Sequence, residues 1–284
     1  MSEDRVRGER LRRTGLLGPA STSISDSVRH LTAVQAQEFD DVCRAMSHRI
    51  AGAPALTDVA DQIATGDVVR HHVLRPTWHL VHVSDLDGLL DLTASRIHAQ
   101  LRSQYRKSGI LDDLARLVAL VGEVVEAAAE PVTRKEIGLA LAARGEAVPS
   151  AGLLHLTLAA ELDKVITTSG RRGTWDTFVP YRSRIPVGEP RDRDEAIAAL
   201  AQRYLTSHAP ASEHDFAWWA GLTLTDAKRA FEQHIAAVRN IRVKQGACNE
   251  RLDEPSVAVA RAEPPRCNTA RTDKMRYCVR RWRG

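Results

Sequence analysis

Apolar residues recur every three or four positions along most of the chain, which predicts a mainly helical protein. The clearest example is segment 110–129, a long amphipathic helix. Shorter segments with the same spacing are 24–34, 38–50, 57–74, 191–209, 210–222 and 223–238. Pro76 ends the helical option in its region, and the β-branched and aromatic residues over 77–83 predict a strand there.

The middle of the chain has the most informative order of elements. After the long helix, a second begins with Thr133 and Glu136 in capping-box spacing. Segment 149–163 predicts a third helix, and segment 164–181 predicts two strands joined by a tight glycine-containing turn. Three helices followed by a hairpin is the order of a winged helix-turn-helix.

The same order starts again further along the chain. The tripeptide PAS (210–212) precedes the second helix of this later group, as PVT (131–133) precedes the second helix of the earlier one. RNIRV (239–243) is a candidate first strand of a wing, but no returning strand follows it. The N-terminal part has similar ingredients. We therefore predict a mainly α fold with small β wings, built as tandem winged helix-turn-helix modules. The predicted units are a first module at 1–108, a second at 109–188, a third, incomplete one at 189–245, and an irregular basic tail at 246–284.

Length and composition set broad limits on the class of protein. A chain of 284 residues with 43% hydrophobic content is long enough for two or three compact units. No apolar run suits a membrane span and the charged N-terminus lacks an apolar signal segment, so we expect a cytoplasmic protein with no membrane partner. The four cysteines have no CxxC or metal-ligand spacing. Reduced thiols are expected, with no metal and no cofactor.

The excess of basic residues is confined to the C-terminal end. Residues 239–284 carry 12 Lys and Arg against 5 Asp and Glu, whereas the rest of the chain carries 28 against 31. Nucleic-acid binding by the body must therefore depend on local patches.

The second module is a poor candidate for reading DNA sequence. Its third helix offers few polar side chains, namely Ser150, His155, Thr157 and Lys164. Arg171 and Arg172, beside the glycine turn of the hairpin, are able to neutralise phosphates, which positions a duplex without specifying its sequence. A solvated turn is the alternative. A sequence-specific regulator is disfavoured, and general binding to double-stranded DNA remains.

Gln35 and Gln37 are the candidate catalytic residues of the first module. They flank Ala36 between two helical segments, and in an extended stretch both side chains address one cleft. Glutamine does not transfer protons near neutral pH, but its amide can hold a water molecule and bind a sugar or base. This suffices for glycosidic hydrolysis when the leaving base is already cationic. The alternative is a pair of structural amides that cap neighbouring backbone.

Three motifs resemble those of the AlkZ/YcaQ-type tandem winged-helix DNA glycosylases. These are Gln-Ala-Gln at 35–37, RPTWHLV at 75–81 and DFAWWAGL at 215–222, with Pro76 in place of the family's glycine. The resemblance covers about residues 9–243. It implies a bacterial enzyme that excises alkylated purines from damaged DNA or unhooks interstrand crosslinks.

The resemblance also implies roles for particular residues. Gln35 and Gln37 would position the attacking water and contact the nucleotide, with Thr77 and His79 as further substrate-binding candidates. Trp218 and Trp219 are expected to pack inside the third module. The rival hypothesis is a non-catalytic winged-helix protein that binds DNA. A monomer is favoured, and the family's β-rich end is not recognisable after Val243.

Overall fold

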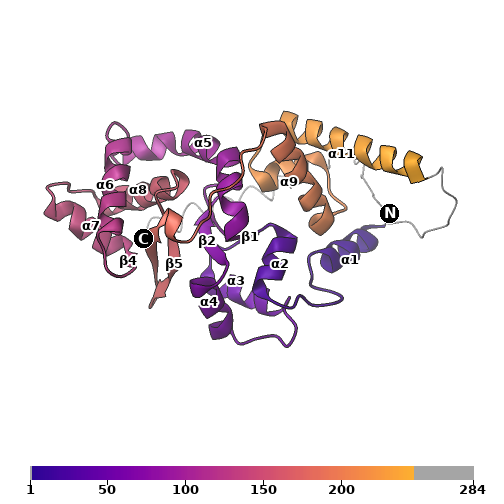
Figure 1. Ribbon diagram of the computed structural model, residues 1–284, viewed down its shortest axis with the longest axis horizontal. Helices are drawn as coiled ribbons and strands as arrows, with labels where there is room; N and C mark the ends of the chain where they lie inside the picture. The colour runs from indigo at the N-terminus through magenta and orange to yellow at the C-terminus, as the bar shows by residue number, and fades with distance from the viewer. Residues whose placement is uncertain (1, 246–284) are drawn as a thin grey trace.

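The computed structural model describes residues 2–245, with side chains up to residue 234. The predicted tail at 246–284 lies outside the described residues. Over the described part the protein is mainly helical with two three-stranded antiparallel sheets, which confirms the predicted fold class. Three groups of elements lie side by side in Figure 1, with the elements of the predicted second module on the left, those of the first in the middle and those of the third on the right; the module names are kept below. The exact module boundaries stay predictions.

The first module contains one of the two sheets. Its elements are α1 (Glu3–Arg13), α2 (Ile24–Leu31), β1 (Ala33–Gln35), α3 (Phe39–Ser47), α4 (Leu56–Thr65), β2 (Val68–His72) and β3 (Trp78–His82). The strand order is β1-β3-β2, all antiparallel. The β2–β3 hairpin is the first wing, and its turn is the segment 73–77.

The second module repeats this topology. Its elements are α6 (Leu114–Glu126), β4 (Val132–Thr133), α7 (Arg134–Ala143), α8 (Ser150–Leu162), β5 (Ile166–Arg172) and β6 (Trp175–Pro180), followed by the short 3-10 helix η1 (Tyr181–Ser183). The strand order is β4-β6-β5, and the β5–β6 hairpin is the second wing. The predicted capping box forms, since Thr133 accepts from the Glu136 N–H and the Glu136 carboxylate accepts from the Thr133 N–H.

The third module consists of helices in the described part of the chain. They are α9 (Arg193–His208), α10 (Glu213–Ala220) and α11 (Leu224–Gln245). Ser212 and Asp215 form a capping box at the start of α10, which confirms that PAS and PVT introduce equivalent helices. The 25-residue helix α5 (Val83–Lys107), which the sequence analysis did not predict as an element, runs from the first module to the second along the top of Figure 1.

Three predicted elements were wrong in detail. The helix expected over 57–74 ends at Thr65, and β2 follows; every residue of β2 is buried, so the strand lacks the polar alternation that would reveal it. The helix expected over 24–34 ends at Leu31, where Thr32 has φ 70° and directs the chain into β1. RNIRV is not a strand, because α11 continues through it to Gln245.

The modules pack through their wings. Strand β5 lies against α4 and β2 of the first module, and the Thr168 hydroxyl donates to the Arg70 carbonyl at 2.6 Å. The third module reaches the turn of the first wing from another side. There, a Cβ added to Gly221 would meet the Leu74 carbonyl oxygen at 1.9 Å, so only glycine fits. Among the described helices, none has the length and apolar character of a membrane span.

Candidate active site

The Gln-Ala-Gln motif begins on the edge strand of the first sheet and ends in a bend. Gln35 is the last residue of β1 and pairs with His79 of β3, and the Ala36 N–H donates to the Trp78 carbonyl at 2.7 Å. Ala36 is fully buried, whereas Gln35 is exposed and Gln37 is half-buried. Gln35 ends the strand and Gln37 lies in a bend, so strand alternation does not fix the direction of the Gln37 side chain. A shared orientation of the two amides stays a prediction.

A buried arginine holds this backbone in place. The Arg70 Nε donates to the Ala36 carbonyl at 2.9 Å, and its Nη2 donates to the Gln37 carbonyl at 3.0 Å. Its Nη1 donates to Asp176 of the second wing at 2.7 Å, and its Cζ lies 4.3 Å from the centre of the Trp78 ring. One guanidinium thus ties the motif to both wings. Such charge-assisted bonds in a buried setting fix geometry well.

The two glutamine side chains have different surroundings. Arg75, in the turn of the first wing, donates from Nη2 to the Gln35 Oε1 at 3.2 Å. The Gln37 amide makes no hydrogen bond to another described residue. Each amide carries two N–H donors and one carbonyl acceptor. Between them, the pair therefore has both donor and acceptor capacity left for a ligand.

Thr77 and His79 lie next to this face but are not open to solvent. The Thr77 hydroxyl is buried, and His79 is 1% exposed, with its Nδ1 2.9 Å from the Thr77 carbonyl. Burial, reinforced by the Arg75 charge, lowers the pKa of His79 to about 3. His79 is therefore neutral at physiological pH. It supports the sheet directly opposite Gln35 rather than facing the solvent.

A buried acid and a histidine lie behind the site, where the first two modules meet. Glu161 of α8 and His72 of β2 are both buried, with 2.6 Å between Oε2 and Nδ1. Burial raises the pKa of Glu161 to about 8, and burial followed by the Arg70 charge lowers the pKa of His72 well below its usual value. The pair therefore holds a single proton near neutral pH, as a carboxylic acid beside a neutral imidazole.

The arginines of the second wing are already paired within the protein. Arg171 lies with its Cζ 4.6 Å from the Phe39 ring centre and its Nη1 3.7 Å from Asp40 of α3. Arg172 contacts Glu136 at 2.7 Å and donates to the Pro131 carbonyl at 2.7 Å. Neither arginine has a hydrogen bond to a glutamine side chain, although Arg171 lies against Phe39, two residues after Gln37. Arg172 is matched closely by Glu136, whereas the contact of Arg171 to Asp40 is long and exposed.

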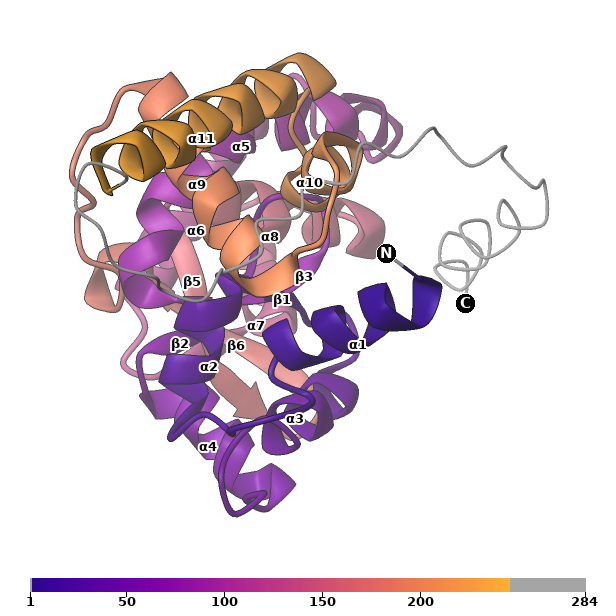
Figure 2. The same ribbon diagram turned by 90° about the vertical axis from the view of Figure 1, so that its right-hand side faces the viewer.

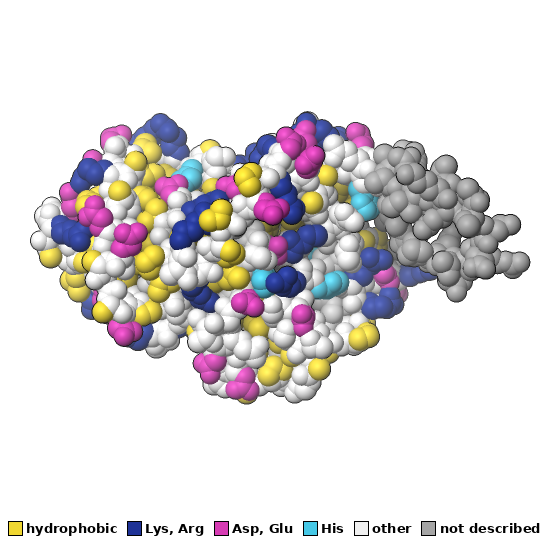
Figure 3. Space-filling view, viewed as in Figure 1, with side chains coloured by type: hydrophobic (Ala, Val, Ile, Leu, Met, Phe, Trp, Pro, Cys, Tyr) yellow, Lys and Arg dark blue, Asp and Glu magenta, His cyan; other side chains and the backbone are white. Residues whose placement is uncertain are grey.

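The third helices of the winged modules do not present base-reading faces. Most of α8 is buried, including Thr157, and His155 bonds Ser108 at 2.7 Å. The exposed side of α4 carries Asp58 and Asp61, which repel a DNA backbone. On the face seen in Figure 3, basic and acidic side chains are interspersed. These features fit non-sequence-specific contact better than sequence readout.

The comparisons with known proteins agree with this architecture. Residues 28–271 match the family described as DNA glycosylase AlkZ-like. The chain belongs to the AlkZ-like DNA glycosylase family. The match extends past Val243, where the motif resemblance ended. Among solved structures, Streptomyces sahachiroi DNA glycosylase AlkZ is similar in fold, with a TM-score of 0.67 and 23% identity over 82% of this chain and 65% of that one. No curated protein matches the chain.

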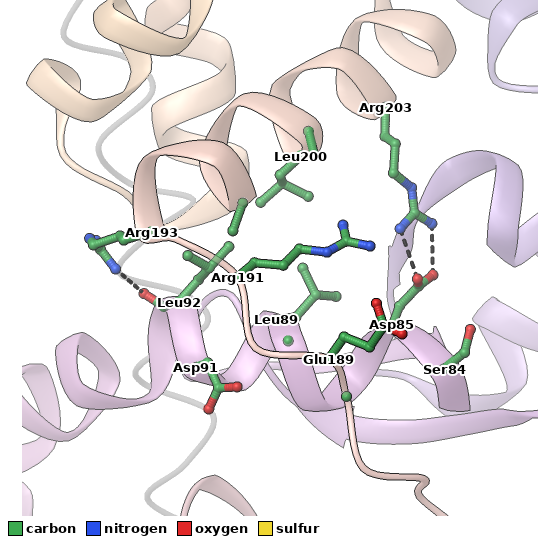
Figure 4. A pocket seen from close by; sticks show the side chains of 14 residues that line it. Ser84, Asp85, Leu89, Asp91, Leu92, Glu189, Arg191, Arg193, Leu200 and Arg203 are labelled. Atoms are coloured by element: carbon green, nitrogen blue, oxygen red, sulfur yellow. Dashed lines mark hydrogen bonds and ion pairs between the residues drawn. The ribbon is translucent and has the colours of Figure 1, made fainter.

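The AlkZ-like chain also contains a cavity that the two glutamines do not line. It encloses about 260 Å³ between α5, the linker before α9, and α9 itself. Figure 4 shows Arg191 extending across it and the bidentate contact between Arg203 and Asp85. None of the six predicted site residues lines this cavity. Figure 2 shows α9, α10 and α11 of the third module above α2, α3 and α4 of the first, with β1 and β3 at the level between them.

Sequence reasoning missed three residues that surround the glutamines in this AlkZ-like fold. Arg70 falls in the stretch that was predicted as a helix, which concealed its position on β2, and Arg75 was quoted within the RPTWHLV motif without a role of its own. Trp218 was expected to pack inside the third module, but it is 60% exposed, with the Arg75 Cζ 4.4 Å from its ring centre. Trp219 packs as expected, against Tyr204 and His208. The signal available in the sequence was the place of Arg75 in the RPTWHLV motif; Arg70, between Val69 and His71, carries none.

Proposed function

We propose that this chain is a monofunctional DNA glycosylase that hydrolyses the N-glycosidic bond of cationic N7- or N3-alkylated purines. Gln35 and Gln37 position the attacking water, and the product is an abasic site. The observation that supports the proposal is the Gln35–Ala36–Gln37 segment at the edge of the first sheet, where Ala36 is buried and both flanking glutamines keep solvent exposure. Membership of the AlkZ-like family supports the reaction class.

The chemistry suits amides because the substrate supplies much of the driving force. Water oxygen bonds to C1′ of the sugar while the bond from C1′ to N9 breaks. The electron pair of that bond moves to the purine and neutralises its positive charge, and the water proton passes to solvent. The leaving base needs no protonation, so groups that only hold and orient water are sufficient. The same cleavage would release one end of an interstrand crosslink attached through purine N7.

The surroundings of the two amides fit a reaction in which the protein positions water and the cationic base leaves without being protonated. His79, the histidine opposite Gln35, is buried and neutral, with its pKa lowered to about 3. It is therefore not placed to protonate a leaving group. The amides also lie on an accessible face, and they do not line the cavity of Figure 4. A base could thus be approached at C1′ without complete extrusion, which costs a few kcal/mol in base-flipping enzymes.

The test is an excision assay on duplex DNA that contains N7-methylguanine. The full chain is incubated with the duplex, and abasic sites are counted by strand cleavage in alkali. Gln35→Ala and Gln37→Ala should each lower the single-turnover rate on the order of 100-fold. Gln62→Ala is the matched control, since Gln62 is an exposed glutamine on α4, away from the motif.

The outcomes separate the enzyme from a protein that only binds DNA. Product at background with wild-type protein, or unchanged rates in both motif variants, would overturn the proposal. If DNA affinity still falls steeply with salt in that case, a non-catalytic DNA-binding role takes its place. Affinity that is flat between low and physiological salt would exclude both functions.

A further inference from the structure

The Gln35 amide is held in one orientation by its neighbour. The Arg75 guanidinium contains only donors, and its Nη2 contacts the Gln35 Oε1 at 3.2 Å. The amide oxygen must therefore face Arg75, and the NH2 group is the part left to address a ligand. The Gln37 amide has no such partner among the described residues. Its oxygen remains available as an acceptor.

Arg75 is in turn placed by the third module. Its Cζ lies 4.4 Å from the centre of the Trp218 ring, within the range of a cation–π contact. The turn that carries Arg75 is short and constrained, because the Arg75 N–H donates to the Val73 carbonyl and the Thr77 N–H donates to the Arg75 carbonyl, both at 2.7 Å. Arg75 therefore has few other directions in which to extend.

Trp218 is not explained by the packing of its own module. Its neighbour Trp219 contacts Tyr204 and Phe216, whereas Trp218 is 60% exposed. A single exposed aromatic residue is ordinary on a protein surface, so the case for Trp218 depends on its contact with Arg75. The close approach of Gly221 to the Leu74 carbonyl brings this helix to the turn of the first wing. Trp218 thereby reaches the arginine that contacts the catalytic motif.

We infer that Arg75 and Trp218 are positioning residues that give the two glutamines different tasks. Held by Arg75, Gln35 offers its NH2 group as a donor to an oxygen of the damaged nucleotide. Gln37 then holds the attacking water through its Oε1. Trp218 stacks on Arg75 and fixes the Gln35 orientation from a different module. This inference rests on the proposed function for the identity of the reaction, but its geometric part is testable alone.

The experiment compares Trp218→Ala and Arg75→Lys with Trp175→Ala in the full-length protein. Trp175 is a matched control, because it is 65% exposed and lies on the second wing. The readouts are the single-turnover excision rate on N7-methylguanine DNA, the dissociation constant for that DNA, and the ¹⁵N-detected NMR signals of the Gln35 NH2 group. Loss of those signals in Gln35→Ala provides their assignment.

We expect Trp218→Ala and Arg75→Lys to shift the Gln35 signals and to lower the rate roughly 10-fold, with a smaller change in the dissociation constant. Trp218→Phe should recover most of the rate, since it restores an aromatic face. Trp175→Ala should leave the signals and the rate near wild type. This pattern would support the positioning role, because a general structural defect would not be rescued by phenylalanine.

Other patterns overturn the inference. A rate in Trp218→Ala equal to that of Trp175→Ala, or a rate loss without any shift of the Gln35 signals, would exclude positioning through Arg75. If wild-type protein excises nothing, the proposed function fails separately, and the NMR comparison alone decides the geometric claim. Unshifted Gln35 signals in both variants would then end it.

Discussion

The two wings have the same strand topology but opposite surroundings. In the first wing, Arg75 lies in the turn, contacts Gln35 and stacks on a tryptophan from the third module. In the second wing, Arg171 and Arg172 lie beside the turn and are held by Asp40 and Glu136. Both hairpins carry arginines at or beside the turn, but the groups that contact these arginines differ between the two wings.

This difference indicates that the second wing acts as a support for the first. Its strand β5 packs on α4 and β2, and its Asp176 holds the arginine that fixes the glutamine backbone. The first wing, by contrast, carries residues that reach the accessible face of the motif. Strand topology alone does not show which wing has arginines available for DNA. The side chains that pair with each guanidinium distinguish the two wings.

The largest effect is expected at the residue that joins the two wings. Arg70→Met should destabilise the protein by about 4 kcal/mol, because it leaves Asp176 without its partner and frees the Ala36 and Gln37 carbonyls. Urea unfolding followed by circular dichroism measures this. Arg171→Met is the control, since its contact to Asp40 is long and partly exposed, and it should cost under ~1 kcal/mol. Equal losses in the two variants would contradict the supporting role of Asp176.

Substitution of two glycines tests how closely α10 packs on the turn of the first wing. Gly221 has φ 65° and would place a Cβ 1.9 Å from the Leu74 carbonyl, whereas Gly173 in the second wing has φ 63° and open space around it. Gly221→Ala should therefore cost about 3 kcal/mol and Gly173→Ala about 1 kcal/mol. The backbone cost is shared, so the difference in unfolding free energy measures the contact between α10 and the first wing. If the two variants were equally stable, that contact would be absent in solution.

The second wing was predictable from sequence and the first only in part. Thr133 and Glu136 form a local capping box, and a glycine turn separates the strands that follow, so short-range signals sufficed. Strand β2 was missed because it is buried on both faces and carries no alternation. Its true partner is β3, and that pairing is tertiary information.

The candidate site shows the same limit. The motif singled out Gln35 and Gln37, and both keep solvent exposure at the edge of the first sheet; their catalytic role stays a prediction. The orientation of the Gln35 amide depends on Arg75 and Trp218, which come from a turn and from another module. Helical periodicity could not say which of two adjacent tryptophans faces outwards. Contacts between distant segments decide such details.

The pH dependence of stability should reveal the buried pair between the first wing and the second module. The folded-state pKa of Glu161 is raised by burial to about 8 from a model-compound value of 4.5, so the contribution of Glu161 to stability falls as the pH rises through this window. Buried histidines with a lowered pKa, such as His79, contribute in the opposite direction. Glu161→Gln cannot titrate and keeps a donor for His72. Relative to wild type it should gain on the order of 2 kcal/mol between pH 5 and pH 8. Thermal and urea unfolding at several pH values provide the comparison.

Glu136→Gln is the control for that titration, because the pKa of Glu136 is lowered by hydrogen bonds from the Thr133 backbone and side chain. A group with a lowered pKa loses its contribution as the pH falls, which is the opposite direction. Parallel pH profiles for the two variants would show that Glu161 is charged in the folded protein. The proton assigned to the Glu161–His72 pair would then be excluded.

The smallest effect is expected at the exposed end of the second wing. Arg172 is 54% exposed in its side chain and pairs with Glu136, which is 44% exposed, so solvent screens most of their attraction. Arg172→Ala should change the unfolding free energy by about 0.5 kcal/mol. If the second wing only supports the first, the salt dependence of DNA affinity should also remain as in wild type, whereas loss of a phosphate contact would reduce the slope of log K against log salt by about one. A reduced slope would therefore indicate that Arg172 contacts a DNA phosphate despite its carboxylate partner. Both wings would then contribute to DNA binding.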